Sequence, residues 1–263
     1  MKYKCPICNE ELKFADKRMV CKNNHSFDMA KSGYVNLFIT NSTNHGDNDI
    51  MANSRRDFLA KGYYQPLKAK IIETIDQYKP NNLLDLACGE GYYTADFPVE
   101  DKCGIDLSKK AINIASKADK KTQYIIASIF NNPLYDNSID MITTIFAPIA
   151  YDEIIRLLKD DGIFIMVNPG TDHLYELKQQ VYDNPYKNEE TIFNYDNLKE
   201  IDIIKVKGIM KLDNNTDIIN LFNMTPYYLK TSRKDIEKLN NITSLDITYD
   251  FNIHIFKKQF TSK

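Results

Sequence analysis

Three cysteines and a histidine near the start of the chain have the spacing of a metal site. They are Cys5, Cys8, Cys21 and His25, in the pattern C-x2-C-x12-C-x3-H. Three thiolates and one imidazole suit a closed tetrahedral structural zinc, with no open position for catalysis. In so short a segment, metal binding is expected to supply much of the folding free energy. The alternative is a fortuitous group of thiols.

A second stretch, LDLACGEGYYT from Leu84 to Thr94, places two glycines and a carboxylate at the end of an apolar run. A strand, a glycine-rich turn and a helix N-terminus form a site for a nucleotide-like ligand. Gly89 and Gly91 let the backbone approach the ligand, and the helix expected from Tyr92 points its N–H groups at the same spot. The stretch lacks the third glycine of a dinucleotide fold and the Gly-Lys-Ser/Thr of a phosphate-binding loop. The alternative is a tight turn that binds nothing.

A carboxylate in register with this turn makes the prediction more specific. Asp106 ends the next apolar run, 21 residues after Asp85, where it can accept hydrogen bonds from both hydroxyls of a ribose. The turn and this carboxylate together resemble the class I S-adenosylmethionine-dependent methyltransferases. The resemblance implies that the turn holds the methionine part of the cofactor and that Asp106 holds its ribose. It also implies that Ser128 and Ile129 lie beside the adenine.

The rest of the chain is expected to supply the elements that position these groups. From residue 82 on, apolar strand-like runs alternate with helical patterns, and the strands look buried on both faces, as in a parallel sheet. We expect an α/β, Rossmann-like methyltransferase domain whose mostly parallel sheet ends in an antiparallel C-terminal edge. The expected strands are 82–87, 102–106, 122–128, 139–146 and 163–169, and the expected helices are 92–97, 108–118 with Ser108 as N-cap, 151–162 closed by Gly162, and 172–182.

We expect three parts along the chain, namely a small zinc-binding module, a linker followed by helices, and the methyltransferase domain: residues 1–40, 41–80 and 81–263. The polar stretch 41–49 predicts an exposed, mobile linker. Helical spacing over 53–78, broken by Gly62 and Pro66, predicts two helices with a turn between them.

Composition and charge limit the classes of function. With 263 residues, 43% of them hydrophobic, the chain is long enough for one large domain and a small appendage. The net charge of −2 gives no global attraction to nucleic acid, although residues 1–40 and 230–263 each carry three more basic than acidic residues. No apolar run predicts a membrane span or a secretory signal. Five cysteines, three of them in the zinc pattern, indicate the reducing cytoplasm, and Cys88 and Cys103 are expected to be small buried residues.

Longer motifs narrow the resemblance to one family. They occur in the order CPIC…C…H, FDMAKSGYVNL, SRRDFLAKGYYQPL, LDLACGEGYYT, GIDLSKKAI, FAP, NPG…HLYELK, MTPYYLK and DFNIHIFKK. Over nearly the whole chain the sequence resembles the bacterial 23S rRNA guanine-N1 methyltransferases, one branch of which is associated with macrolide resistance. The resemblance implies a homodimer whose zinc module helps to recognise a 23S rRNA hairpin. It also implies that four residues lie at the cofactor site: Tyr64, Tyr93, Thr94 and His173.

Three residues depart from the family pattern. Ala87 stands where the family has Gly, Thr144 stands where it commonly has Arg, and Asp172 stands where Arg often precedes the His. The last two changes make the expected substrate pocket less positive, which bears on the affinity for the RNA target or on its identity. The change at Ala87 is expected to be mild, and the other two are not expected to affect cofactor binding.

The implied reaction needs alignment and the loss of one proton. Guanine N1 is a poor nucleophile until its proton leaves, whereas a methyl group on a sulfonium is already electrophilic. Bases modified in RNA can be splayed onto aromatic side chains. We therefore expect Phe146 and Pro148 to hold the guanine and Asp85 to orient the cofactor, although the FAP motif could simply end a strand.

Two further motifs have open interpretations. Arg55 and Arg56 either contact phosphate or form a solvated helix face. The segment Met224–Lys230 either stacks on RNA or forms an apolar lid or core strand.

Two other functions stay open at this point. The chain could be a methyltransferase of a small molecule or a protein, or a non-catalytic zinc-containing RNA-binding relative. The intact Asp85, Gly89, Gly91 and Asp106 count against the non-catalytic relative. The net acidic middle of the chain, together with Thr144, gives the alternative of a small-molecule or protein methyltransferase its weight.

Overall fold

The computed structural model describes residues 1–39 and 49–259. The linker expected at 41–49 lies outside the described residues, apart from Asp49, which already belongs to the first long helix. Within the described ranges, no helix combines the length and apolar character that crossing a membrane requires.

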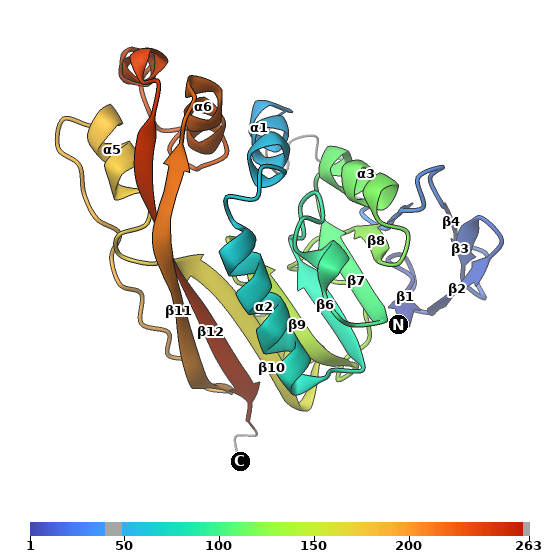
Figure 1. Cartoon of the computed structure of the whole chain (residues 1–263). Helices are drawn as coiled ribbons and strands as arrows, with labels where there is room; N and C mark the ends of the chain where they lie inside the picture. The colour runs from blue at the N-terminus through green and yellow to red at the C-terminus, as the bar shows by residue number, and fades with distance from the viewer. Residues whose placement is uncertain (40–48, 260–263) are drawn as a thin grey trace.

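In the described part of the chain, an eight-stranded sheet forms the centre of the molecule (Figure 1), in the order β11-β12-β10-β9-β6-β7-β8-β5. Its strands are β5 (Val35–Asn36), β6 (Asn82–Leu86), β7 (Asp101–Asp106), β8 (Gln123–Ile126), β9 (Ile139–Ile145), β10 (Leu158–Pro169), β11 (Leu198–Leu212) and β12 (Leu245–Lys258). Neighbouring strands from β10 to β5 pair in parallel, whereas β12 runs antiparallel to both β10 and β11. The predicted mostly parallel sheet with an antiparallel C-terminal edge is confirmed.

Helices cover both faces of this sheet. They are α1 (Asp49–Leu59), α2 (Gln65–Tyr78), α3 (Lys109–Ala118), α4 (Tyr151–Leu157), α5 (Tyr175–Val181), α6 (Asn215–Asn223) and α7 (Arg233–Glu237), with the 3-10 helices η1 (Thr94–Asp96) and η2 (Lys238–Asn241). Ile71 of α2 packs in one buried cluster with Leu83, and Ile154 of α4 packs in another with Leu84. Consecutive residues of β6 thus enter opposite cores, which is why the neighbouring Leu83 and Leu84 are both apolar. The pair α1 and α2 confirms the two helices predicted over 53–78.

The prediction of a helix from Tyr92 was wrong, because the chain forms only the short η1 there. The segment before β7 is short and contains Pro98, which has no N–H to give to a helix. Carbonyl groups that a longer helix would have paired internally accept hydrogen bonds from the buried Lys102 of β7. Its Nζ donates to the carbonyl oxygens of Ala95 (2.7 Å) and Phe97 (2.9 Å). The glycine turn therefore faces the cavity with its own backbone and not with the end of a helix.

Helix α4 is also shorter than predicted. The pattern suggested that it runs to Gly162, but α4 ends at Leu157 and β10 begins at the next residue. Asp161 adopts a φ of +62°, and the register of β10 against β9 shifts between Leu158 and Ile163. Gly162 therefore belongs to an irregular start of β10 and does not close a helix.

A second sheet forms the N-terminal module. Its antiparallel strands are β1 (Tyr3–Lys4), β2 (Glu11–Ala15), β3 (Arg18–Val20) and β4 (Ser26–Asp28). The module joins the main sheet through β5, which pairs in parallel with β8, and it lies beside that edge in Figure 1. The ammonium group of Met1 pairs with Asp101 at 3.0 Å, and Lys4 pairs with Asp136 at 2.7 Å. The module is therefore fixed against the edge of the sheet.

Candidate functional site

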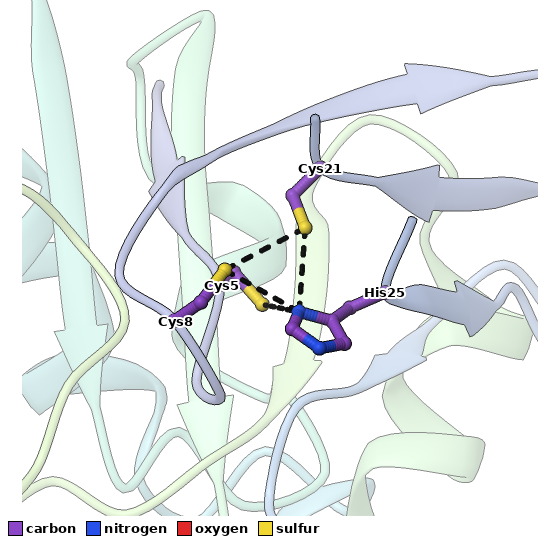
Figure 2. Close-up of side chains that lie close together, drawn as sticks. All are labelled: Cys5, Cys8, Cys21 and His25. Atoms are coloured by element: carbon purple, nitrogen blue, oxygen red, sulfur yellow. Dashed lines mark hydrogen bonds between the residues drawn. The ribbon is translucent and has the colours of Figure 1, made fainter. Parts of the chain in front are cut away.

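The four residues predicted as metal ligands gather in one cluster of the N-terminal module, Cys5, Cys8, Cys21 and His25 (Figure 2). Nδ1 of His25 lies 3.3 Å from Sγ of Cys8 and 3.5 Å from the Sγ atoms of the other two cysteines. The Sγ atoms of Cys8 and Cys21 are 3.7 Å apart. A tetrahedral zinc with bonds of about 2.3 Å to sulfur and about 2.0–2.1 Å to nitrogen needs S···S edges of about 3.8 Å and S···N edges of about 3.6 Å. The cluster fits a zinc ion bound through Nδ1.

Two short turns hold these ligands. Asn9 and Asn24 adopt φ values of +60° and +61°, a left-handed conformation that Asn tolerates better than most residues. Each Asn N–H donates back to the carbonyl oxygen of a ligand cysteine, at 2.8 and 3.0 Å. A hydrogen bond from the backbone of Glu10 is the main cause that lowers the pKa of the Cys8 thiol to about 6, which favours the thiolate that binds metal.

A cavity of about 1250 Å³ opens at the carboxyl ends of β6, β7, β9 and β10. Helix α1 and two segments, 186–193 and 224–227, supply further parts of its lining. Pockets for drug-sized ligands usually measure about 300–1,000 Å³. The cavity therefore has room for a nucleoside cofactor together with a planar substrate group.

Asp85 lines this cavity but is only 2% exposed. The hydroxyl of Thr94 donates to its Oδ2 at 2.5 Å, and the hydroxyl of Thr143 donates to its Oδ1 at 2.7 Å. Burial raises the pKa of Asp85 to about 6, although the two hydroxyls act in the opposite direction. Thr94 is fully buried and outside the cavity lining, so it can reach a ligand only through Asp85.

Asp106, at the end of β7, is tied to the glycine turn. The N–H of Gly89 donates to its Oδ2 at 3.0 Å, and the N–H of Ser108 donates to its Oδ1 at 2.7 Å. A carboxylate oxygen can accept more than one hydrogen bond, so these contacts are compatible with two ribose hydroxyls. Ser108 also caps α3 as predicted, since its Oγ accepts the N–H of Ala111 at 3.2 Å.

The two glycines of the turn have different surroundings. A Cβ on Gly89, whose φ is +56°, would meet nothing within 4 Å. A Cβ on Gly91, whose φ is +78°, would lie 2.6 Å from the hydroxyl oxygen of Tyr124 and 3.0 Å from Cβ of Ala115. Gly91 is thus required by packing, whereas Gly89 faces open space at the cavity. Ala87 has a φ of +58°, which gives a physical reason for the glycine of the family pattern at that position.

Four rings form an aromatic group at the carboxyl ends of β9 and β10. Tyr64, Phe146 and His173 line the cavity, and their ring centroids lie 6.2, 6.4 and 6.5 Å apart. The fully buried Phe251 lies 4.6 to 5.4 Å from each of them. The planes of Phe146 and His173 differ by 11°. Together with Pro148, which also lines the cavity, these rings offer stacking surface for a planar base.

Phe146 holds an unusual backbone conformation. Its φ is +54°, which costs a side chain with a Cβ about 1–2 kcal/mol, and its ring is 42% exposed. The N–H of Phe146 donates to the carbonyl oxygen of Val167 on β10 at 3.0 Å, which holds this conformation in place. Strain of this kind concentrates at functional sites. The FAP motif therefore ends β9 and presents the ring of Phe146 to the cavity.

His173 is neutral at physiological pH. Burial lowers the pKa of His173 to about 3, and the charge of Lys178 acts in the same direction. Its Nδ1 accepts the backbone N–H of Asp250 at 3.3 Å, so the ring proton of the neutral form sits on Nε2. His173 can donate a hydrogen bond but carries no positive charge.

Most residues predicted for the cofactor and the substrate line this one cavity: Tyr64, Asp85, Gly89, Tyr93, Asp106, Phe146, Pro148 and His173. Gly91, Thr94 and Ser128 lie outside its lining. The hydroxyl of Ser128 accepts the N–H of Phe130 at 3.1 Å within a turn, and Ile129 and Phe130 supply the apolar wall beyond β8.

Three residues of the site were not predicted from the sequence. Asn168 is the next-to-last residue of β10, and its buried Oδ1 has no hydrogen-bond partner among the described residues. Its NPG motif, at the end of the fifth predicted strand, was an available signal. Phe251 gave no such signal in the sequence, because nothing in its neighbouring residues distinguishes it from other core residues of β12. Cys88 lines the cavity and is half-buried, whereas Cys103 is fully buried as predicted.

The charged residues singled out in the sequence, Arg55, Arg56 and Asp172, have different surroundings in the structure. Arg55 lines the cavity, whereas Arg56 is exposed and pairs with Asp57 at 2.8 Å. Asp172 pairs with Lys187 at 2.7 Å and with Lys207 at 2.5 Å. The hydrogen bond from Lys187 is the first cause that lowers the pKa of Asp172 to about 2. The negative charge that replaces the Arg of the family pattern is thus balanced locally.

The fold and the cavity define a class of protein. An open parallel sheet, a glycine turn after its first central strand and a carboxylate at the end of the next strand are the features of a class I S-adenosylmethionine-dependent methyltransferase. A family model described as a methyltransferase domain matches residues 79–214, and a zinc-ribbon model described as "RlmA, N-terminal" matches residues 3–42. The cofactor is therefore S-adenosylmethionine, and the cysteine–histidine cluster is a zinc site.

Relatives narrow this class further. The chain is 33% identical to the putative 23S rRNA (guanine-N1-)-methyltransferase YxjB of Bacillus subtilis, over 97% of both proteins. It is 31% identical to the 23S rRNA (guanine(748)-N1)-methyltransferase of Streptomyces fradiae, over 66% of this chain and 65% of the relative. A putative 23S rRNA (guanine-N1-)-methyltransferase of Micromonospora griseorubida is 29% identical over 66% of this chain and 68% of the relative. The chain belongs to the family of 23S rRNA (guanine-N1)-methyltransferases.

Proposed function

We propose that this protein transfers a methyl group from S-adenosylmethionine to N1 of a guanine in a hairpin loop of 23S rRNA. The observation that carries the proposal is one cavity that joins the glycine turn and Asp106 to an aromatic group around Phe146. A relative that aligns over 97% of both proteins, and is named for this reaction, supports it over methylation of a small molecule or a protein.

Different residues of the cavity bind different parts of the cofactor. Bound S-adenosylmethionine supplies an electrophilic methyl group on its sulfonium. Asp106 accepts hydrogen bonds from the ribose hydroxyls, and Gly89 lets the backbone approach the methionine part. Ile129 and Phe130 give the adenine an apolar wall. Asp85, held by two threonine hydroxyls, keeps the turn in place and orients the cofactor.

The aromatic group positions the guanine. A base splayed out of the RNA stacks on Phe146 and Pro148, which brings N1 in line with the methyl carbon and the sulfur. Transfer of the methyl group to N1 would release S-adenosylhomocysteine, and the proton of N1 would pass to solvent water. The neutral His173 carries its ring proton on Nε2, so it can donate a hydrogen bond to the base but does not itself take the N1 proton.

The zinc module completes the proposal. It carries exposed apolar side chains, Ile7 (54% exposed) and Phe14 (48% exposed), on a segment with an excess of basic residues. Such a surface can contact both the bases and the phosphates of an RNA hairpin. A homodimer, in which two such modules frame one RNA cleft, and a location in the cytoplasm are parts of the same proposal. Light scattering of the purified protein with and without the RNA hairpin tests the dimer.

Transfer of label from S-adenosylmethionine tests the reaction. The substrate is 23S rRNA from a strain that lacks this gene, and primer extension locates the product because methylation at N1 blocks pairing. We expect label in 23S rRNA and one new stop at a guanine in a hairpin loop. Label in a low-mass extract alone would support the small-molecule alternative. Retention of RNA on a filter without any transfer would support a non-catalytic relative.

A further inference from the structure

We propose that Arg55 binds the carboxylate of the methionine part of S-adenosylmethionine. The inference rests on the proposed function and adds to it a cation for the anionic end of the cofactor. That carboxylate is ionised at neutral pH, and burying it in a cavity without a partner is unfavourable. The glycine turn and Asp106 supply no positive charge for it.

Helix α1 places Arg55 between the two ends of the cavity. The residues of α1 that line the cavity share one helical face: Met51, Ala52, Arg55 and Leu59. Asp49, at the start of α1, pairs with Lys110 at the start of α3 at 2.8 Å, close in the chain to Asp106. Near the other end of α1, the ring of Phe58 lies 5.6 Å from that of Tyr64 in the aromatic group. Figure 1 shows α1 standing between α6 and α3 above the sheet.

Among the described residues that line the cavity, the Arg and Lys side chains are those of Arg55 and Lys187. The charged lining residues are Arg55, Asp85, Glu90, Asp106, Lys187 and Glu189. Lys187 belongs to the segment 186–193, which follows α5 and is far from the glycine turn in the chain. An anion bound between the glycine turn and the aromatic group therefore has Arg55 as its cationic partner.

The guanidinium of Arg55 lies near two tyrosine hydroxyls of the same cavity. Burial raises the pKa of both Tyr64 and Tyr93, and the charge of Arg55 partly offsets this increase for each. The hydroxyl of Tyr93 is buried and has no hydrogen-bond partner among the described residues. Nη2 of Arg55 also donates to the carbonyl oxygen of Met224 at 3.4 Å, which holds the side chain against the segment 224–227. A guanidinium has five donors in a planar fork, so it can bind a carboxylate in addition to such a partner.

Two ligands that differ at the carboxylate separate this role from a structural one. S-Adenosylhomocysteine carries the aminocarboxypropyl group, whereas 5′-methylthioadenosine has the same nucleoside and sulfur but lacks the carboxylate. Calorimetry on the zinc-loaded protein measures the affinity for each. Arg55→Met should weaken binding of S-adenosylhomocysteine about 10- to 100-fold, the usual worth of a charge-assisted hydrogen bond. The affinity for methylthioadenosine should stay within about twofold of wild type.

Arg56→Met is the matched control, because Arg56 neighbours Arg55 on the same helix, is exposed and does not line the cavity. It should leave both affinities unchanged. Equal loss of both ligands in Arg55→Met would show that Arg55 only maintains the fold, and unchanged binding of both would remove it from the cofactor site. Either result overturns the proposal while the methyltransferase function stands. A wild-type protein that binds neither ligand would overturn both.

Discussion

Gly89→Ala and Gly91→Ala are expected to destabilise the protein to different extents and for different reasons. Both glycines adopt a positive φ, so each alanine has a backbone cost of about 1–2 kcal/mol in the free energy of unfolding. At Gly89 the new methyl group would meet nothing within 4 Å. At Gly91 it would lie 2.6 Å from the Tyr124 hydroxyl oxygen, and overpacking of this kind adds about 1–3 kcal/mol. Gly91→Ala should therefore cost about 2–5 kcal/mol and Gly89→Ala about 1–2 kcal/mol.

Urea denaturation of the zinc-loaded protein measures the stability, and calorimetry with S-adenosylhomocysteine measures the affinity for the cofactor product. Gly89→Ala should lose affinity because its methyl group occupies the space in which the ligand approaches the backbone. Gly91→Ala combined with Tyr124→Phe should regain part of the lost stability, because the closest contact is removed, and Tyr124→Phe alone is the control. Equal destabilisation by the two glycine variants, with no recovery in the double variant, would refute the reasoning.

Three further outcomes are expected. Phe146→Ala should raise the KM for the RNA substrate by about 5- to 150-fold, the worth of one stacked base, while calorimetry finds the affinity for S-adenosylhomocysteine unchanged; an unchanged KM would remove Phe146 from the substrate site. Chelation of zinc should unfold residues 1–40, because metal binding supplies about 10 kcal/mol or more to such modules; limited proteolysis should then cut within this segment, and continued resistance to protease would contradict the zinc assignment. Because burial raises the pKa of Asp85 to about 6, from about 3.9 when unfolded, this group contributes most stability below pH 4, and the contribution is lost as the pH rises through 6. Asp85→Asn should therefore gain stability relative to wild type as the pH rises from about 4 to about 7, by up to about 3 kcal/mol, in parallel urea titrations, and a difference that does not change with pH would count against the raised pKa of Asp85.

Features encoded by neighbouring residues could be predicted from the sequence. The zinc ligands follow from spacing alone, because short turns must bring Cys5 and Cys8 together and return His25 to them. The parallel sheet follows from strands such as β6, in which the neighbouring Leu83 and Leu84 are both apolar because both faces of the sheet are covered. Asp106 could be placed because its distance along the chain from Asp85 fixes its position at the end of the next strand.

Features that depend on tertiary packing could not be predicted. The helix expected after the glycine turn is replaced by η1, and the buried Lys102 that satisfies the carbonyl groups there comes from the following strand. Gly91 looked like a ligand contact but is required by Tyr124, which approaches it from β8. Phe251 reaches the aromatic group from β12, far away in the sequence, so no local pattern indicates it.

The pairing of β5 with β8 makes the metal centre and the methyl-donor pocket parts of one continuous sheet. Because this connection runs through backbone hydrogen bonds, the fold sets the distance between the zinc module and the methyl-donor pocket. Unfolding of the zinc module would remove β5 from the edge of β8. Because Ile129 follows β8 closely in the chain, the adenine end of the pocket would also be disturbed. Oxidation of the thiols would then lower the affinity for the methyl donor.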